Sequence, residues 1–200
     1  MTESAPKPSR KQHILETLAF MLEANPGDRI SIAALAKSVG VSEAALYRHF
    51  PSKTRMLEDL IGFAEDAIFS RINNITHEAL TATDKLERIS HVYLVFCERN
   101  PGITRLLTGD AISGETERLH ARVRQFFDRF STALRQILRK AELEEGLHLA
   151  LSVNETIQLM QACVEGLVAV FIRSQFKTHP SQHWPMQFAV IWRGAMLKNS

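Results

Sequence analysis

Cysteine is scarce in this sequence, which has only Cys97 and Cys163 among 200 residues, each inside a helical apolar pattern. Two thiols make neither a disulfide framework nor a metal site. No uninterrupted apolar run reaches the roughly 18 residues that a membrane span needs, and the first residues lack the pattern of a secretory signal. We therefore expect a protein of the reducing cytoplasm with no metal, no cofactor and no membrane association.

Catalytic motifs are lacking as well, because no HExxH, phosphate-binding loop or nucleophile elbow occurs. The acidic pairs Glu58 with Asp59 and Glu65 with Asp66 are each adjacent on a helix, and adjacent helical residues do not face each other. The dispersed histidines are His77, His91, His120 and His148. We expect no catalytic residue and no enzyme activity.

Charge of one sign is not in large excess, since the net charge is +2. The distribution is uneven, because residues 1–55 hold eight basic and five acidic residues whereas the remainder holds 16 and 17. A basic excess confined to one end of a chain favours an acidic partner such as nucleic acid there.

Helical periodicity runs along most of the chain, and no strand pattern is found, so the fold is expected to be all-α. The expected helices span residues 10–24, 32–39, 43–50, 53 to beyond 68, 83–99, 102–108, 115–140, 153–175 and 183–197.

The stretch GVSEAALYRHFPSKTRML, residues 40–57, contains two helix boundaries in close succession. Gly40 suits a left-handed turn after one short helix, and Pro51 ends the next one. Two short helices joined by a tight glycine turn make a helix-turn-helix, and helices so short must be braced by their neighbours. The expected domains are an arm at residues 1–9, a three-helix DNA-binding domain at residues 10–55 and a helical regulatory and dimerisation domain at residues 56–200.

The second short helix of this motif has two different faces. Leu46 and Phe50, four residues apart, can dock on the preceding helix, which leaves Ala44 and Arg48 on the opposite face. A small alanine lets the backbone approach a groove floor, and an arginine reaches a base edge or a phosphate. The competing interpretation is a helical hairpin with a solvated charged face. The expected DNA-binding residues are Ser31, Ser42, Ala44, Ala45, Tyr47, Arg48, His49 and Lys53.

The stretch VGVSEAALYRHFPSKTRML resembles the DNA-binding region of the TetR family of bacterial regulators. In that family a glycine turn, a recognition helix ending in YRHF or similar, and a following SK recur together. The resemblance implies a TetR-like fold and a homodimer of two-domain subunits, each of which reads one half of a pseudopalindromic DNA site.

Four segments of the second domain resemble one branch of that family, the nucleoid-occlusion factors. These segments are SRINNI (70–75), ERNPGITRLLTGDA (98–111), RVRQFFDRFSTALRQILRK (122–140) and FIRSQFKTHPS (171–181). The resemblance implies a nucleoid-associated protein that, activated by DNA, antagonises assembly of the division protein FtsZ and blocks division over the chromosome. The alternative is a TetR transcriptional repressor whose small-molecule ligand pulls the two recognition helices out of register.

The same resemblance places the FtsZ tail, an extended acidic and apolar peptide, against Phe63, Arg71, Arg99 and Asn100. The chemistry fits, because an aromatic ring can anchor the peptide, two guanidinium groups can bind carboxylates and an amide can pair with peptide backbone. From the residues alone, Arg71 could equally belong to a solvated helix face, and Asn100 could be a helix-terminal residue that tolerates turn geometry.

The helix at residues 153–175 is apolar nearly all round, so it must be buried on more than one side. A seam made with the same helix and the last helix of a second subunit would cover it, and a two-fold interface is the commonest arrangement. The competing interpretation is a core within one chain. The expected interface residues are Leu167, Phe171, Trp184, Phe188, Ile191 and Ala195.

Overall fold

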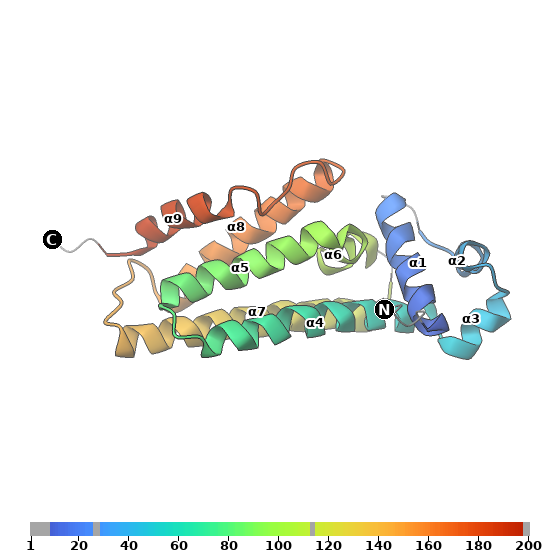
Figure 1. Ribbon diagram of the computed structural model, residues 1–200, viewed down its shortest axis with the longest axis horizontal. Helices are drawn as coiled ribbons and strands as arrows, with labels where there is room; N and C mark the ends of the chain where they lie inside the picture. Colours follow the sequence, from blue (N-terminus) through green and yellow to red (C-terminus); the bar gives the residue numbers. More distant parts are fainter. Residues whose placement is uncertain (1–8, 26–28, 113–114, 198–200) are drawn as a thin grey trace, which may run out of the picture. The chain divides into compact units, whose positions relative to one another are not determined.

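The computed structural model describes residues 9–25, 29–112 and 115–197, and this part of the chain is all-α, as predicted (Figure 1). Apart from Ser9, the predicted arm lies outside the described residues. The helices are α1 (Arg10–Ala24), α2 (Ile32–Val39), α3 (Glu43–His49), α4 (Lys53–His77), α5 (Ala82–Arg99), α6 (Pro101–Leu107), the 3-10 helix η1 (Asp110–Ile112), α7 (Glu117–Glu144), α8 (Val153–Arg173) and α9 (Trp184–Ala195). One isolated antiparallel bridge joins Leu149 to Met196.

Serine side chains begin several of these helices. The hydroxyls of Ser9, Ser31, Ser42 and Ser152 each accept a hydrogen bond from the backbone N–H three residues later. At α8 the cap is reciprocal, because the carboxylate of Glu155 accepts from the hydroxyl of Ser152 at 2.6 Å and from its backbone N–H at 2.9 Å, and these two bonds lower the pKa of Glu155. Local capping chemistry therefore helps to set where these helices start.

One compact unit consists of the chain up to Phe63 together with residues Asn100–Val123. It joins the helix-turn-helix to α6, η1 and the start of α7. α6 packs closely on α1, since a Cβ added to Gly102 would lie 2.0 Å from the carbonyl oxygen of Ala19. Fully buried residues of this unit include Ile14, Leu18, Leu35, Leu46, Phe50 and Leu106.

A buried arginine closes the C-terminal end of α1. Arg105 in α6 is 2% exposed, and its guanidinium donates to the carbonyl oxygens of Leu22 and Asn25, the latter at 3.0 Å, while it pairs with Asp110. The last carbonyls of a helix have no partner within it, and they carry the negative end of its dipole. Arg105 satisfies both requirements and ties α1 to α6.

The second compact unit consists of residues 64–99 and the chain from 124 onward. Its centre is aromatic: the ring of Tyr93 lies 5.5 Å from that of Phe130 and 6.1 Å from that of Phe127. Burial raises the pKa of Tyr93 well above its ordinary value.

In this second unit α8 and α9 both pack on α5 (Figure 1). The indole N–H of Trp184, at the start of α9, donates to the carbonyl oxygen of Glu87 at 3.1 Å. By length and composition α8 could cross a membrane, and 33% of its apolar window is buried within the unit. Its buried residues form one stripe, so a second apolar face of the same helix stays exposed.

Candidate nucleic-acid interface and partner surfaces

α3 is held by one face and exposed on the other. Leu46 and Phe50 are fully buried, and Gly40, with φ at +74°, makes the left-handed turn that brings α3 against α2. Ala44 and Arg48 are exposed, as the spacing predicted. A small-residue edge of a braced helix is therefore open to a partner.

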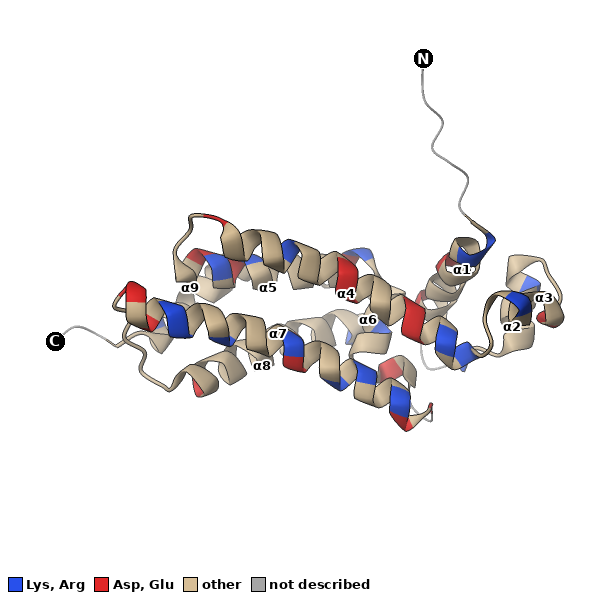
Figure 2. Ribbon diagram, turned by 90° about the horizontal axis from the view of Figure 1, so that it is seen from below, with Lys and Arg blue, Asp and Glu red and all other residues tan. Residues whose placement is uncertain are grey.

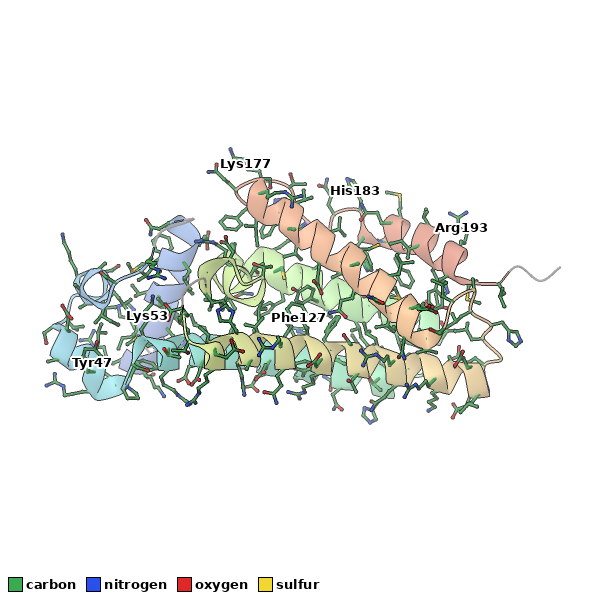
Figure 3. The ribbon with its side chains drawn as sticks, turned by 180° about the vertical axis from the view of Figure 1, so that it is seen from behind. Tyr47, Lys53, Phe127, Lys177, His183 and Arg193 are labelled. Carbon is green, nitrogen blue, oxygen red and sulfur yellow. The ribbon has the colours of Figure 1, made fainter. Side chains whose placement is uncertain are left out.

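The flanks of this edge carry polar and aromatic groups. Tyr47, labelled in Figure 3, is 48% exposed, His49 is exposed and Ala45 is half-buried. Arg48 makes no hydrogen bond or ion pair with any residue that the structure describes. Its guanidinium group can therefore donate to an external acceptor.

Ser31 and Ser42 have structural roles as helix caps. The hydroxyl of Ser31 accepts from Ala34 N–H at 3.1 Å, and that of Ser42 accepts from Ala45 N–H at 3.2 Å. A hydroxyl that accepts in this way keeps its own hydrogen to donate. Both exposed serines can therefore cap a helix and contact a phosphate at the same time.

Lys53, expected as a phosphate ligand, has a partner within the chain. Its ammonium lies 2.8 Å from the carboxylate of Glu115, and the two side chains are 24% and 18% exposed. Nearby, Lys11 and Arg55 pair with Asp59 at 3.3 and 2.9 Å. Figure 2 shows basic and acidic segments following each other along the start of α4. Acids of the same unit thus neutralise part of its basic excess.

The four residues expected to bind the FtsZ tail belong to different units. Phe63, which is 53% exposed, and the half-buried Asn100 lie in the first unit, whereas Arg71 and Arg99 are exposed in the second. Phe63 and Arg71 are both in α4, eight residues apart in the sequence. Asn100 caps α6, and its carbonyl oxygen accepts from Thr104 N–H at 2.9 Å.

Four of the six expected interface residues lie in the core of the subunit itself. These four, each at most 3% exposed, are Phe171, Trp184, Phe188 and Ala195. Leu167 and Ile191 are half-buried. The physical reason is that α8 and α9 are each apolar on two faces. The six predicted interface residues lie mostly on the face that packs inside the subunit. For these four residues the structure favours the competing interpretation, a core within one chain.

The opposite faces of the same helices carry the apolar residues that the sequence analysis overlooked. Leu159 and Val170 of α8 are 44% and 39% exposed, and Met186 and Val190 of α9 are 67% and 62% exposed. Met186 and Val190 are four residues apart, so helical spacing was present here too. Periodicity marks both stripes, and it does not say which one faces the core.

Neither Cys97, which is buried, nor Cys163, which is half-buried, forms a disulfide. Among the residues that the structure describes, no group of three or more His, Cys, Asp or Glu residues could hold a metal ion.

Two family models match the chain. The model of bacterial regulatory proteins of the tetR family matches residues 14–60, which contain the helix-turn-helix. The SlmA-like model of the tetracyclin repressor-like C-terminal domain matches residues 81–195, more than half of the chain.

Several known proteins are similar to this chain over nearly their whole length. The nucleoid occlusion factor SlmA of Marinomonas sp. (strain MWYL1) is 49% identical over 191 residues, 96% of this chain and 97% of the relative. SlmA of Shewanella frigidimarina (strain NCIMB 400) is 50% identical over 193 residues, 96% of each. The crystal structure of the TetR family transcriptional regulator PfmR from Thermus thermophilus has a TM-score of 0.77 at 22% identity, covering 90% of this chain and 97% of that one, and supports the fold.

These matches define the class: the chain belongs to the TetR family of bacterial regulatory proteins and is a homodimeric, DNA-binding protein. TetR-family members are regulators that act by binding DNA rather than by catalysis. Within the family the chain belongs with the SlmA nucleoid occlusion factors.

Proposed function

We propose that the homodimer binds pseudopalindromic DNA sites through α3 and, while bound, antagonises assembly of FtsZ, so that division is blocked over the chromosome. The observation that carries this proposal is 49% identity to a SlmA nucleoid occlusion factor over 96% of the chain. The identity extends over the second domain as well as over the DNA-binding domain. The open face of α3 supports it further. The protein would then be cytoplasmic and associated with the nucleoid.

To read a DNA sequence, a helix must come close to the base edges and must direct a hydrogen-bond donor at them. Ala44 and Ala45 add little bulk to the edge of α3, so its backbone can come near the floor of the major groove. Arg48 can donate to a guanine edge or a phosphate. Tyr47 and His49 are placed to contact phosphates, which position a helix without reading sequence. The remaining proposed phosphate ligands are Ser31, Ser42 and Lys53.

Two copies of α3 reach successive grooves only if the subunits share a two-fold interface. The exposed apolar faces of α8 and α9 support this arrangement, because a four-helix seam made with a second copy would cover both. The apolar residues that we assign to the interface are Leu159, Leu167, Val170, Met186, Val190 and Ile191.

The FtsZ tail is the proposed ligand of Phe63, Arg71, Arg99 and Asn100. An exposed phenyl ring suits an apolar anchor residue, and guanidinium groups bind carboxylates through two parallel hydrogen bonds. Arg71 and Arg99 form no ion pair in the part of the chain that the structure describes, so both charges are open to a ligand.

Co-sedimentation with polymerising FtsZ, with and without a DNA site taken from a genome-wide occupancy map, tests the proposal. We expect binding that DNA strengthens and that Arg99→Glu abolishes while DNA affinity is unchanged. Arg88→Glu, a charge reversal at another exposed arginine of α5, should keep both activities. Two results together would instead support a ligand-responsive repressor. These are no binding to FtsZ with or without DNA, and an occupancy map dominated by one operator beside one promoter.

A further inference from the structure

A groove of about 620 Å³ runs between α7 and α8, wholly within the second unit. Eight residues line it; two are arginines, none is acidic and none is aromatic. Its floor is Ile157, which is 1% exposed. A volume of this size is typical of ligand sites, and a lining with positive charge alone favours an anionic ligand.

One wall of the groove presents two guanidinium groups from α7. Arg135 bonds only to Thr132, one turn away, at 3.4 Å, and Arg139 has no hydrogen bond or ion pair among the described residues. Like charges one helical turn apart repel each other, so the pair Arg135 and Arg139 slightly destabilises α7. An anion in the groove would remove that repulsion.

The opposite wall presents side-chain amides from α8. Asn154 and Gln158, also one turn apart, form no hydrogen bond within the described part of the chain. Gln161 is fixed differently, because its carboxamide accepts from the hydroxyl of Ser131 and donates to Glu165 at 2.9 Å. The free amides offer both donors and acceptors, which is the combination that peptide backbone requires.

The acids nearest the groove on α8 do not neutralise its arginines. Glu155 is held in the capping box by Ser152, and Glu165 accepts from Gln161. The groove also lies on a different face of α8 from the exposed Leu159 and Val170 that we assign to the dimer seam, so a second copy on that seam leaves it accessible.

We propose that this groove, named here the α7–α8 groove, binds an extended acidic peptide whose carboxylates occupy alternate positions. The guanidinium-bearing residues are four apart, which is about 6 Å along a helix. Side chains two apart in an extended peptide are about 6.6 Å apart and lie on the same side. The two carboxylates would pair with Arg135 and Arg139 while the amides of Asn154 and Gln158 pair with the peptide backbone. A nucleotide is disfavoured, because no aromatic ring lines the groove for a base to stack on.

The test is fluorescence anisotropy with a labelled Gly-Asp-Thr-Asp-Thr-Gly peptide and the full-length homodimer. All proteins carry Arg99→Glu, which reverses the charge of one of the two arginines proposed to bind FtsZ, so that failure of one proposal does not imply failure of the other. We expect saturable binding that Arg135→Gln with Arg139→Gln weakens by about tenfold or more, as expected for the loss of charge-assisted hydrogen bonds. Lys177→Gln, at an exposed lysine between α8 and α9 (Figure 3), should leave the affinity unchanged.

Two further peptides separate the spacing from net charge alone. The isomer Gly-Asp-Asp-Thr-Thr-Gly should bind more weakly, and the neutral Gly-Asn-Thr-Asn-Thr-Gly should not bind. Equal affinity of the two acidic isomers, or unchanged affinity in the double arginine variant with its helical circular dichroism intact, would overturn the proposal. Displacement of the acidic peptide by inorganic phosphate at an equal concentration of charge would also overturn it, because the groove would then be a simple anion site.

Discussion

The ammonium group of Lys53, at the start of α4, lies 2.8 Å from a carboxylate oxygen of Glu115, which is 62 residues further along the chain. Both side chains are mostly buried, so solvent and salt screen the pair less than they would at the surface. A DNA phosphate that recruits Lys53 must therefore displace a carboxylate.

Replacing Glu115 with glutamine should strengthen DNA binding. The amide no longer holds the ammonium as an ion pair, so Lys53 becomes available to phosphate, and we expect about a fivefold gain, equivalent to about 1 kcal/mol. Anisotropy titrations with a labelled operator measure it. In a chain that already carries Lys53→Gln the same change should give no gain; a gain that persists there would show that Glu115 acts by general repulsion of DNA.

Gly102→Ala should destabilise the protein by about 2 kcal/mol or more. The new Cβ would meet the carbonyl oxygen of Ala19 at 2.0 Å, so α6 has to move away from α1. Urea unfolding followed by circular dichroism measures the loss. The matched control is Gly62→Ala in α4, where nothing lies within 4 Å of the added Cβ; helix propensity predicts a gain of about 0.5–1 kcal/mol. Equal effects of the two substitutions would contradict the close approach of α6.

Arg105→Met should cost about 3 kcal/mol of stability, because it leaves the buried terminal carbonyls of α1 without a donor and removes the partner of Asp110. Methionine keeps most of the apolar volume, so the loss would report on hydrogen bonds more than on packing. Asp110→Asn, at a side chain that is 44% exposed, should lower the stability by less than Arg105→Met does. A larger loss at Asp110 would show that the ion pair, and not the bonds to the carbonyls of α1, is the main contribution of Arg105.

Val190→Glu should convert the dimer to a folded monomer. Val190 is 62% exposed in the subunit, so a charge there is tolerated by the single chain and excluded only from an apolar seam. Size-exclusion chromatography with light scattering measures the mass. Phe188→Ala, two residues earlier but 3% exposed, should instead lower the unfolding free energy by about 3–5 kcal/mol. A Val190→Glu protein that stays dimeric would place the interface elsewhere.

Alkaline pH should destabilise the fold through Tyr93. Its pKa is raised well above the ordinary value of about 10 by burial, so above that pH the unfolded chain releases a proton that the folded chain keeps. The contribution of Tyr93 is therefore fully present below about pH 10 and is lost as the pH rises further. With Tyr47→Phe, Tyr93 is the single tyrosine, and its tyrosinate absorbance should rise only together with the loss of helical circular dichroism. Tyrosinate formation while the helical circular dichroism is unchanged would refute the expectation that Tyr93 ionises only on unfolding.

Helix positions and the two faces of α3 could be predicted from sequence because they depend on local chemistry. Gly40 and Ser42 act through bonds within a few residues, and the burial of Leu46 follows from spacing alone. The interface on α8 and α9 could not be predicted in this way. Phe171 and Val170 are apolar neighbours in sequence, and the packing of the folded chain decides that the first is buried, with its ring against Phe176, and the second exposed.

The contact of Lys53 with Glu115 could not be predicted from the sequence pattern either. Nothing near Glu115 in the sequence indicates a contact with a residue 62 positions earlier, and a basic residue beside a helix-turn-helix was expected to point at DNA. Long-range ion pairs are set by how elements pack, which composition and periodicity do not encode.

The contacts of the buried Arg105 have a consequence for the order in which parts of the chain fold during synthesis. The unit that holds the recognition helix is discontinuous and is completed by Asn100–Val123, so a ribosome that has released only the first 63 residues has not yet supplied the segment that caps α1. The unit that contains the recognition helix is therefore completed only after α4 and α5 have been synthesised in full, so it folds late in the synthesis of the chain.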